Sequence, residues 1–160
     1  MKVDMKKIKL SQGKIALVSD VDYVYLNQWK WHSGRYATRT DYSVEPRQTI
    51  YLHRLVLARM GYDYANQGDH KDRNKLNCCR SNLRPATRPQ NQHNQGKYKN
   101  NTSGYKGVVW HKQGRKWMAR ITIDGKDVYL GLFKHKIDAA RAYNKSALEY
   151  RAEFAGVNIL

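Results

Sequence analysis

The sequence is poor in acidic residues and in cysteine, and each shortage narrows the classes of protein it can encode. Thirteen Asp and Glu stand against thirty Lys and Arg in 160 residues, which leaves a formal net charge of +17. Such an excess attracts polyanions, so nucleic acid is the expected partner. The two cysteines, Cys78 and Cys79, are adjacent and cannot form the separated C-x2-C pairs of a structural zinc site. We therefore expect reduced thiols and no structural zinc.

Neither a membrane segment nor a leader is expected from the sequence. No stretch approaches the roughly 18 consecutive apolar residues that a membrane helix needs. The first residues, MKVDMKKIKL, contain no apolar run followed by a small-residue cleavage site. We expect a cytoplasmic protein without a membrane partner.

The apolar content is high enough for packed cores. Hydrophobic residues make up 41% of the chain and aromatic residues 11%, including four Trp and twelve Tyr. A disordered basic tail has a poorer composition. The segment Pro89–Gly104 has one aromatic and no aliphatic residue, so we interpret it as an exposed connector. We place a boundary near Gly96, which separates two basic domains, 1–96 with a balance of +9 and 97–160 with +8.

In the first half, local patterns predict a mixture of strands and helices. The apolar run Lys14–Val18 is typical of a strand, and Ser19 offers an N-cap for a short helix through Trp29. Extended segments are expected at residues 35–40 and 49–52, on either side of a turn at Glu45-Pro46. The segment HRLVLARM that follows has helical spacing and ends at Gly61.

In the second half, three β-prone runs precede one amphipathic helix. The runs are Tyr105–Trp110, Lys116–Ile123 and Val128–Phe133, and Asp124-Gly125 is a strong hairpin signal between the last two. Apolar and small residues then recur at helical spacing from Ala139 to Arg151. The predicted fold class is α+β, with a three-stranded antiparallel sheet packed on one helix at the C-terminus.

The segment Gly68–Asn94, GDHKDRNKLNCCRSNLRPATRPQNQHN, resembles the core of HNH endonucleases, especially the phage and intron homing type. The match falls on Asp69, His70, Asn82 and Asn91, with N-L-R between the two asparagines. The resemblance implies a ββα-metal core in which Asp69-His70 ends one strand and Leu83-Arg84 lies on the next. Thr87 would then cap a helix with Pro89 in its first turn.

The residue types suit phosphodiester hydrolysis. A neutral imidazole is a competent general base near neutral pH, and carboxylate and amide oxygens are hard ligands for Mg²⁺ or Mn²⁺. By resemblance, His70 is the catalytic base, Asn82 orients it through a hydrogen bond, and Asp69 and Asn91 bind one divalent ion. The arginines expected to bind DNA phosphate are Arg84 and Arg88.

Two features near this core leave alternatives open. His53 stands beside an apolar helix, where a structural or phosphate-orienting role is favoured over a catalytic one. Family members commonly carry D-N-R-R before the N-L-R element, whereas this chain has Asn77, Cys78, Cys79 and Arg80 there.

The segment Ser103–Asn158 resembles the AP-two/ERF DNA-binding domain of plant transcription factors and of phage and bacterial HNH proteins. The match includes YKGV, KWMARI, YLGLF, AARAYNKSALEY and the final Asn158. The resemblance implies a sheet that docks in the major groove of DNA. The usual acidic residue and Thr that open the helix are replaced by Lys134 and His135, and Asp138 compensates in part.

Strand alternation divides KWMARIT into two faces. Trp117, Ala119 and Ile121 share one face, and the core is favoured over base stacking for Trp117, Tyr129 and Phe133. The opposite face is the expected DNA surface, and it carries Lys116, Met118, Arg120 and Thr122. Further DNA contacts are expected from Lys106, Trp110, Lys112, Arg115 and Lys126.

These patterns predict a metal-dependent endonuclease of the HNH homing type that acts on double-stranded DNA. If a phage encodes it, the setting is the cytosol of the host cell. The alternative is a non-enzymatic DNA-binding regulator with a degenerate HNH half. An RNA-binding protein fits the charge but not the sheet-reading domain. The target sequence, nicking versus double-strand cleavage, and a monomeric versus a homodimeric state do not follow from the sequence.

Overall fold

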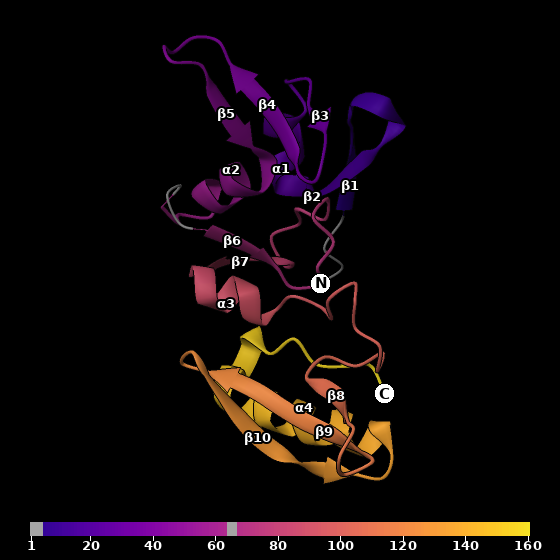
Figure 1. The fold of residues 1–160 in the computed structure, drawn as a ribbon. Helices are drawn as coiled ribbons and strands as arrows, with labels where there is room; N and C mark the ends of the chain where they lie inside the picture. The colour runs from indigo at the N-terminus through magenta and orange to yellow at the C-terminus, as the bar shows by residue number, and fades with distance from the viewer. Residues whose placement is uncertain (1–4, 64–66) are drawn as a thin grey trace. The chain divides into compact units, whose positions relative to one another are not determined.

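The computed structural model describes residues 5–63 and 67–160. The chain divides into two compact units, Met1–Asn91 and Gln92–Leu160, each of which is described by itself (Figure 1). The division falls shortly before the expected boundary at Gly96. Within the described ranges, no helix has the length and apolar character required to cross a bilayer.

Among the described residues of the N-terminal unit there are three small antiparallel sheets, the helices α1 and α2, a 3-10 turn at Ser11–Gly13 and the start of α3. Its elements are β1 (Met5–Lys9), β2 (Ile15–Ser19), α1 (Asp20–Leu26), β3 (His32–Ser33), β4 (Ala37–Asp41), β5 (Gln48–Tyr51), α2 (Leu52–Arg59), β6 (Gln67–His70), β7 (Leu83–Ala86) and the start of α3 (Arg88–His93). The sheets are β1-β2, β3-β4-β5 and β6-β7. The strands and helices expected from the sequence are present, and β1 and β3 are additional.

Helix α1 is shorter than expected because its ends have tertiary partners. It stops at Leu26 rather than Trp29, and the Leu26 carbonyl accepts a hydrogen bond from the Trp31 indole at 2.9 Å. Ser19 occupies the N-cap position but makes no side-chain cap. Its hydroxyl instead accepts the Arg80 backbone N–H at 2.9 Å. Both ends are thus determined by residues outside the helix.

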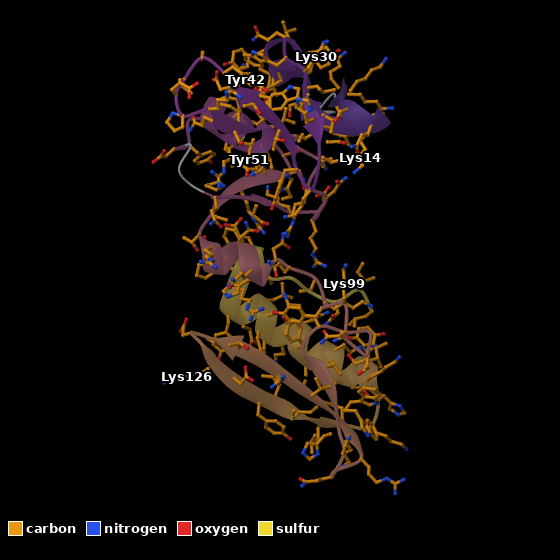
Figure 2. The ribbon with its side chains drawn as sticks, turned by 45° about the horizontal axis from the view of Figure 1, so that its top comes forward. Lys14, Lys30, Tyr42, Tyr51, Lys99 and Lys126 are labelled. Carbon is orange, nitrogen blue, oxygen red and sulfur yellow. The ribbon has the colours of Figure 1, made fainter. Side chains whose placement is uncertain are left out.

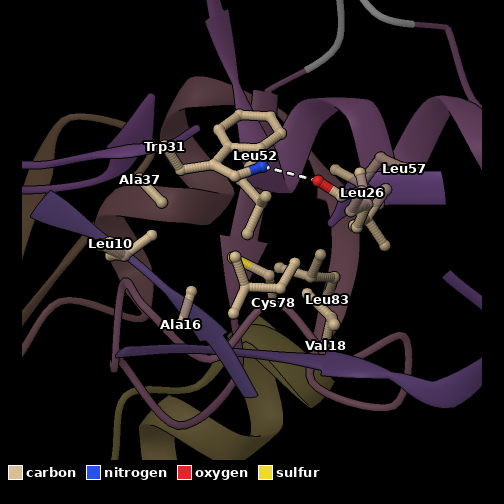
Figure 3. Packing of buried hydrophobic residues seen from close by; sticks show 12 residues of the cluster. Leu10, Ala16, Val18, Leu26, Trp31, Ala37, Leu52, Leu57, Cys78 and Leu83 are labelled. Carbon is tan, nitrogen blue, oxygen red and sulfur yellow. Dashed lines mark hydrogen bonds between the residues drawn. The ribbon is translucent and has the colours of Figure 1, made fainter. Parts of the chain in front are cut away.

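The core of this unit joins β1, β2, α1 and α2 to the loop that precedes β7. Figure 3 shows Cys78 among Leu10, Ala16, Val18 and Leu83, and its side chain is fully buried. Burial raises the pKa of the Cys78 thiol far above its ordinary value. Cys78 therefore acts as a small apolar core residue, and both cysteines are free thiols.

A buried carboxylate links α1, α2 and the same loop. Asp22 is fully buried and accepts hydrogen bonds from Arg59 Nε at 2.8 Å and from Arg80 Nε and Nη2 at 2.7 and 2.8 Å. Burial raises the pKa of Asp22, but the hydrogen bonds and charges of the two arginines outweigh it and lower the pKa below 3.8. Arg80, which matches the last arginine of the D-N-R-R pattern, thus anchors the loop to α1.

We predict that Asp22→Asn lowers the free energy of unfolding by about 2 kcal/mol at pH 7, because two arginines lose their buried counter-ion. A carboxyl with a lowered folded-state pKa stabilises the fold above its unfolded pKa, and that contribution is lost as pH falls through the folded pKa. The difference between wild type and variant should therefore shrink below about pH 4. Urea unfolding at several pH values measures it. Asp20→Asn is the control, since Asp20 pairs with Lys6 at 3.6 Å on the surface; an equal loss there would contradict the prediction.

The C-terminal unit is a three-stranded meander covered by one long helix (Figure 1). Its elements are the end of α3, β8 (Val108–His111), β9 (Lys116–Ile123), β10 (Lys126–Phe133) and α4 (Lys136–Arg151). The bounds of β9 agree with the sequence prediction, and Asp124 and Gly125 both have positive φ in the hairpin turn. Ala139, Ala140 and Ala147 are fully buried, so the helix lies close to the sheet. The α+β class is confirmed.

Hydrogen bonds of Asn158 connect the last residues of this unit to Lys106, which precedes β8. Asn158 Oδ1 accepts the Lys106 N–H at 2.6 Å, its Nδ2 donates to the Lys106 carbonyl at 3.1 Å, and its backbone N–H donates to Asn144 at 2.7 Å. The residue after Lys106 is Gly107, with φ of 74°. A Cβ there would lie 2.0 Å from the ring of Tyr143, so only glycine fits.

Part of the expected connector is ordered structure. Residues 89–93 belong to α3, Asn94 is buried, and Ser103 is 2% exposed with hydrogen bonds to Asn101 and Tyr105. The composition suggested an exposed segment, but side-chain amides and hydroxyls here bond to nearby backbone and form turns.

Candidate functional site

The hairpin β6-β7 and helix α3 form a ββα arrangement that gathers three of the predicted residues. Asp69 and His70 are the last residues of β6 and pair with Arg84 and Leu83 of β7. On α3, Asn91 donates from Nδ2 to the carbonyl of Gly68 at 3.2 Å. The amide of Asn91 therefore lies beside the strand that carries Asp69 and His70.

The start of α3 has the cap expected from the sequence. Thr87 Oγ1 accepts the Gln90 N–H at 3.4 Å, and Gln90 Oε1 accepts the Thr87 N–H at 2.8 Å. This reciprocal pair is a capping box, and it holds the first turn against the end of β7. Asn91 follows directly, so the cap helps to set the position of its side chain.

Asp69 is bound to an arginine rather than exposed to solvent. Its Oδ2 accepts Arg84 Nε at 2.9 Å and Arg84 Nη2 at 2.7 Å, and the two residues are 1% and 8% exposed. The phosphate contact expected of Arg84 is therefore not the contact in this structure. Arg88, the other arginine expected to bind phosphate, is exposed at the first position of α3.

His70 is enclosed within the unit. Its side chain is fully buried, its Nε2 lies 4.0 Å from Cys78 Sγ, and its ring centroid is 5.1 Å from that of His53 and 6.1 Å from that of Tyr36. Burial, together with the charge of Lys75, lowers the pKa of His70 to about 4. The imidazole is therefore neutral at pH 7, the form that a general base needs.

Asn82 stabilises the loop between β6 and β7. Its Oδ1 accepts the Asp72 N–H at 3.0 Å, and its Nδ2 donates to Asp72 Oδ1 at 2.9 Å and to the Asn77 carbonyl at 2.7 Å. Within the described residues, none of its hydrogen bonds runs to His70. The direct orienting role expected of Asn82 stays a prediction, whereas its contribution to the loop is visible.

The donor types at this site fit a hard divalent cation. Asp69 offers carboxylate oxygen, and Asn91, whose nitrogen is bonded to Gly68, has an amide oxygen at the other end. Arg84 competes with a cation for Asp69. In the part of the chain that the structure describes, no three His, Cys, Asp or Glu side chains gather as a metal cluster. An ion here would thus depend on the asparagine.

In the C-terminal unit, one face of the sheet carries the side chains expected to contact DNA. Lys116, Met118, Arg120 and Thr122 alternate with Trp117, Ala119 and Ile121 along β9, and the latter two are buried. Arg120 Nη1 donates to Asp127 Oδ2 at 2.9 Å, and Thr122 Oγ1 donates to Asp127 Oδ1 at 2.6 Å. The Arg120–Asp127 pair is about half exposed, so solvent weakens it and DNA can replace it.

Two further residues lie on this face, Tyr129 and His111, although the sequence favoured the core for the first. Tyr129 pairs with Arg120 across β10-β9 and is 61% exposed, so the preference for the core was wrong. His111 pairs with Lys116. The sequence held the signal for Tyr129. A two-residue turn at Asp124-Gly125 pairs Tyr129 with Arg120, and directly paired residues lie on the same face of a sheet.

Two other expected DNA contacts lie elsewhere. Lys106 Nζ donates to the carbonyls of His93 and Gln95 at 2.8 and 2.5 Å, so it stabilises the chain that leaves α3. Trp110 pairs with Trp117 on the helix-facing side of the sheet, with ring centroids 5.0 Å apart, although it is 46% exposed. The remaining expected contacts, which are exposed in or beside turns, are Lys112, Arg115 and Lys126.

If Arg120 reads a base edge, we predict that Arg120→Ala reduces discrimination between target and non-target duplex by roughly 1 to 3 kcal/mol. Fluorescence anisotropy of the full chain in chelator, with both duplexes, measures it. Arg141→Ala is the control, since Arg141 makes a similar exposed pair with Asp138, at 3.2 Å, on α4. Equal losses of affinity for both duplexes would indicate that Arg120 contacts the DNA backbone and not a base.

Comparison with known proteins gives relatives for the whole chain and for parts of it. No family model matches the chain. The chain is 30% identical over 155 residues to the protein of Acanthamoeba polyphaga mimivirus named Uncharacterized HNH endonuclease L560, and the match covers 92% of this chain and 76% of that protein. It is 32% identical over 78 residues to the AP2-like ethylene-responsive transcription factor TOE2 of Arabidopsis thaliana, 49% of this chain and 16% of that factor.

A third relative is Protein 3.8 of Escherichia phage T7, 43% identical over 58 residues. That match covers 36% of this chain and 48% of the phage protein, so the chain spans about half of its length. Since the mimivirus match extends over most of both proteins, and since β6, β7 and α3 bring Asp69, His70 and Asn91 together, the chain belongs to the HNH endonuclease family.

Proposed function

We propose that the protein is a metal-dependent DNA endonuclease of the homing type, in which residues 1–96 cleave DNA and residues 97–160 bind the target duplex. The observation that supports it most is the hydrogen bond from Asn91 to Gly68, which puts the predicted metal ligand of α3 beside Asp69 and His70. Phosphodiester hydrolysis needs a base and a cation together, and this is where the chain offers both.

In this proposal each residue has a defined task. His70 takes a proton from the attacking water. Asp69 and Asn91 hold one Mg²⁺ or Mn²⁺ ion, which would supply positive charge at the scissile phosphate and the leaving oxygen. Arg84 holds the carboxylate of Asp69 in place through its two hydrogen bonds. Burial keeps the imidazole of His70 neutral, and the charge of the half-buried Lys75 adds to that effect.

The burial of His70 has a consequence for this mechanism. A general base must contact the water that it deprotonates, and His70 is fully buried. DNA binding would therefore have to open the packing of Tyr36 and His53 over the ring. The same burial favours the second candidate function, a DNA-binding regulator without cleavage, to which the similarity to a plant transcription factor adds support.

The C-terminal unit would supply target recognition. Tethering a DNA-binding unit to a small nuclease unit raises the effective concentration of each unit at the DNA site that the other has bound. One cutting site per chain cleaves one strand in one encounter, so a double-strand break would need a dimer or two successive events.

Cleavage of DNA from the native locus tests this function. Purified protein is incubated with a panel of fragments in Mg²⁺ or Mn²⁺, with and without chelator, and products are mapped on both strands. We expect cleavage that depends on the ion and occurs at a defined site. Specific binding without cleavage in either ion would support the regulator.

A further inference from the structure

A hollow of about 210 Å³ lies beside the predicted metal ligand Asn91 in the N-terminal unit. Its lining comes from β5, β6, α2, α3 and the bend before β4, and consists of Tyr36, Tyr51, His53, Arg54, Gln67, Gly68 and Asn91. Pockets for drug-sized ligands are larger, roughly 300 to 1,000 Å³, so a single chemical group is the better fit. None of the lining residues is acidic.

Positive charge surrounds the hollow. The guanidinium of Arg54 lies 5.1 Å from the ring centroid of Tyr51, and both Arg35 and Lys75 lie over Tyr36, at 5.8 and 5.9 Å. Burial, followed by the charges of His70, Arg54 and Lys75, lowers the pKa of His53 to about 3. His53 is therefore neutral at pH 7, and the positive charge around the hollow is that of Arg54, Arg35 and Lys75.

His53 carries a buried ring nitrogen that has no hydrogen-bond partner in the described part of the chain. The residue is 5% exposed, its ring lines the hollow, and its buried Nδ1 is the atom without a hydrogen-bond partner among residues 5–63 and 67–160. A buried polar group without a partner carries a desolvation cost, so its retention indicates a ligand. Gly68 permits this arrangement, because a Cβ there would lie 3.0 Å from His53 Cδ2 and 2.6 Å from Leu57.

The hollow also lies at the start of α2. Tyr51 is the N-cap of this eight-residue helix and gives no side-chain cap, and the first turn has no acidic residue. Backbone N–H groups at a helix start favour an anion. Figure 2 labels Tyr51, the last residue of β5.

We propose that this hollow binds one phosphate of the DNA strand that is cut, next to the scissile phosphate, with Arg54 as the charged partner and His53 as a hydrogen-bond donor. The position next to the scissile phosphate rests on the proposed function, since Asn91 lines the hollow and is the predicted metal ligand. The chemistry of the ligand, a phosphate group, is argued from the size and basic surroundings of the hollow.

Inorganic phosphate is the first probe, and it requires neither DNA nor cleavage. The imidazole ¹⁵N signals of His53 in the full chain are followed by NMR during a phosphate titration. We expect a saturable shift in the wild type and at least about tenfold weaker binding in Arg54→Gln, the loss for one hydrogen bond to a charged group. Arg47→Gln is the matched control, because Arg47 also stacks on a tyrosine, 5.2 Å from Tyr42, outside the hollow.

Duplex DNA in chelator is the second probe, and it separates a DNA phosphate from a free phosphate site. Arg54→Gln should weaken DNA binding to all sequences alike. The slope of log K, the association constant, against log salt concentration is negative, and the variant should reduce its magnitude by about one relative to the Arg47→Gln reference. A salt slope equal to that of the control would show that DNA does not use the hollow. A His53 shift that survives Arg54→Gln would overturn the site.

Cleavage measured on the same proteins keeps the two proposals apart. If the wild type cleaves DNA and Arg54→Gln binds phosphate and DNA as the wild type does, the proposed phosphate site is wrong while the proposed nuclease function is supported. If Arg54→Gln fails both binding tests while the wild type cleaves nothing, the phosphate site stands and the nuclease is wrong.

Discussion

His70→Ala is expected to lower the rate of DNA cleavage by roughly 100-fold or more, the effect of losing a general base. DNA affinity should remain nearly unchanged, because arginines and lysines elsewhere neutralise most of the phosphates. Single-turnover cleavage at saturating Mg²⁺ or Mn²⁺ measures the rate, and anisotropy in chelator measures the affinity. Wild-type rates in the variant would remove His70 from the mechanism.

Burial of His70 requires two controls for this experiment. The ring is fully buried beside Cys78 and His53, so alanine leaves a cavity that lowers stability. His70→Gln retains most of the volume without a basic nitrogen, and it should lose cleavage as His70→Ala does while unfolding at a higher temperature. His32→Ala removes an exposed histidine from β3 of the same unit and should leave cleavage intact.

Gly107→Ala is expected to destabilise the C-terminal unit by about 3 kcal/mol or more, from overpacking and from a positive φ that alanine adopts poorly. The added Cβ would lie 2.0 Å from Tyr143 Cδ2 and 2.7 Å from the Arg120 carbonyl. Hydrogen exchange at the amides of β9 measures the loss. Binding to target DNA should fall with it, because Arg120 lies on that strand.

Gly125→Ala separates the two causes. Gly125 also has positive φ, 77°, but nothing lies within 4 Å of its Cβ position. It should therefore show only the backbone cost, roughly 1 to 2 kcal/mol. Equal losses in the two variants would mean that contact with Tyr143 contributes nothing. If the units are independent, exchange in β6 and β7 of the N-terminal unit should not change in either variant.

Local signals in the sequence were enough for much of the fold. The bounds of β9, the turn at Asp124-Gly125 and the alanine-rich face of α4 are determined by residues close together in the chain. The capping box of Thr87 and Gln90 is equally local. Strand β1 was missed because its segment, MKKIK, buries only Ile8 and shows no apolar alternation.

The candidate site was predicted in its residues but not in its contacts. The resemblance to HNH endonucleases suggested that Asp69, His70 and Asn91 belong together, and the structure brings them to one hairpin and helix. The bond of Arg84 to Asp69 was not predicted, and neither was the hollow beside Asn91. The sequence does not distinguish an arginine that binds phosphate from one that pairs with a carboxylate, as Arg84 does in the structure.

What the sequence by itself determined is therefore the order of most elements and the basic character of both halves, and it suggested residues for hydrolysis that stay a prediction. Only the tertiary structure decided which charges are compensated, as for Asp22 between Arg59 and Arg80, and which side chains are buried, as for His70. Helix caps, turns and strand alternation arise within a few residues, where backbone geometry limits the choices. Ion pairing and burial join residues that are far apart in the chain, so they exist only once the chain has packed.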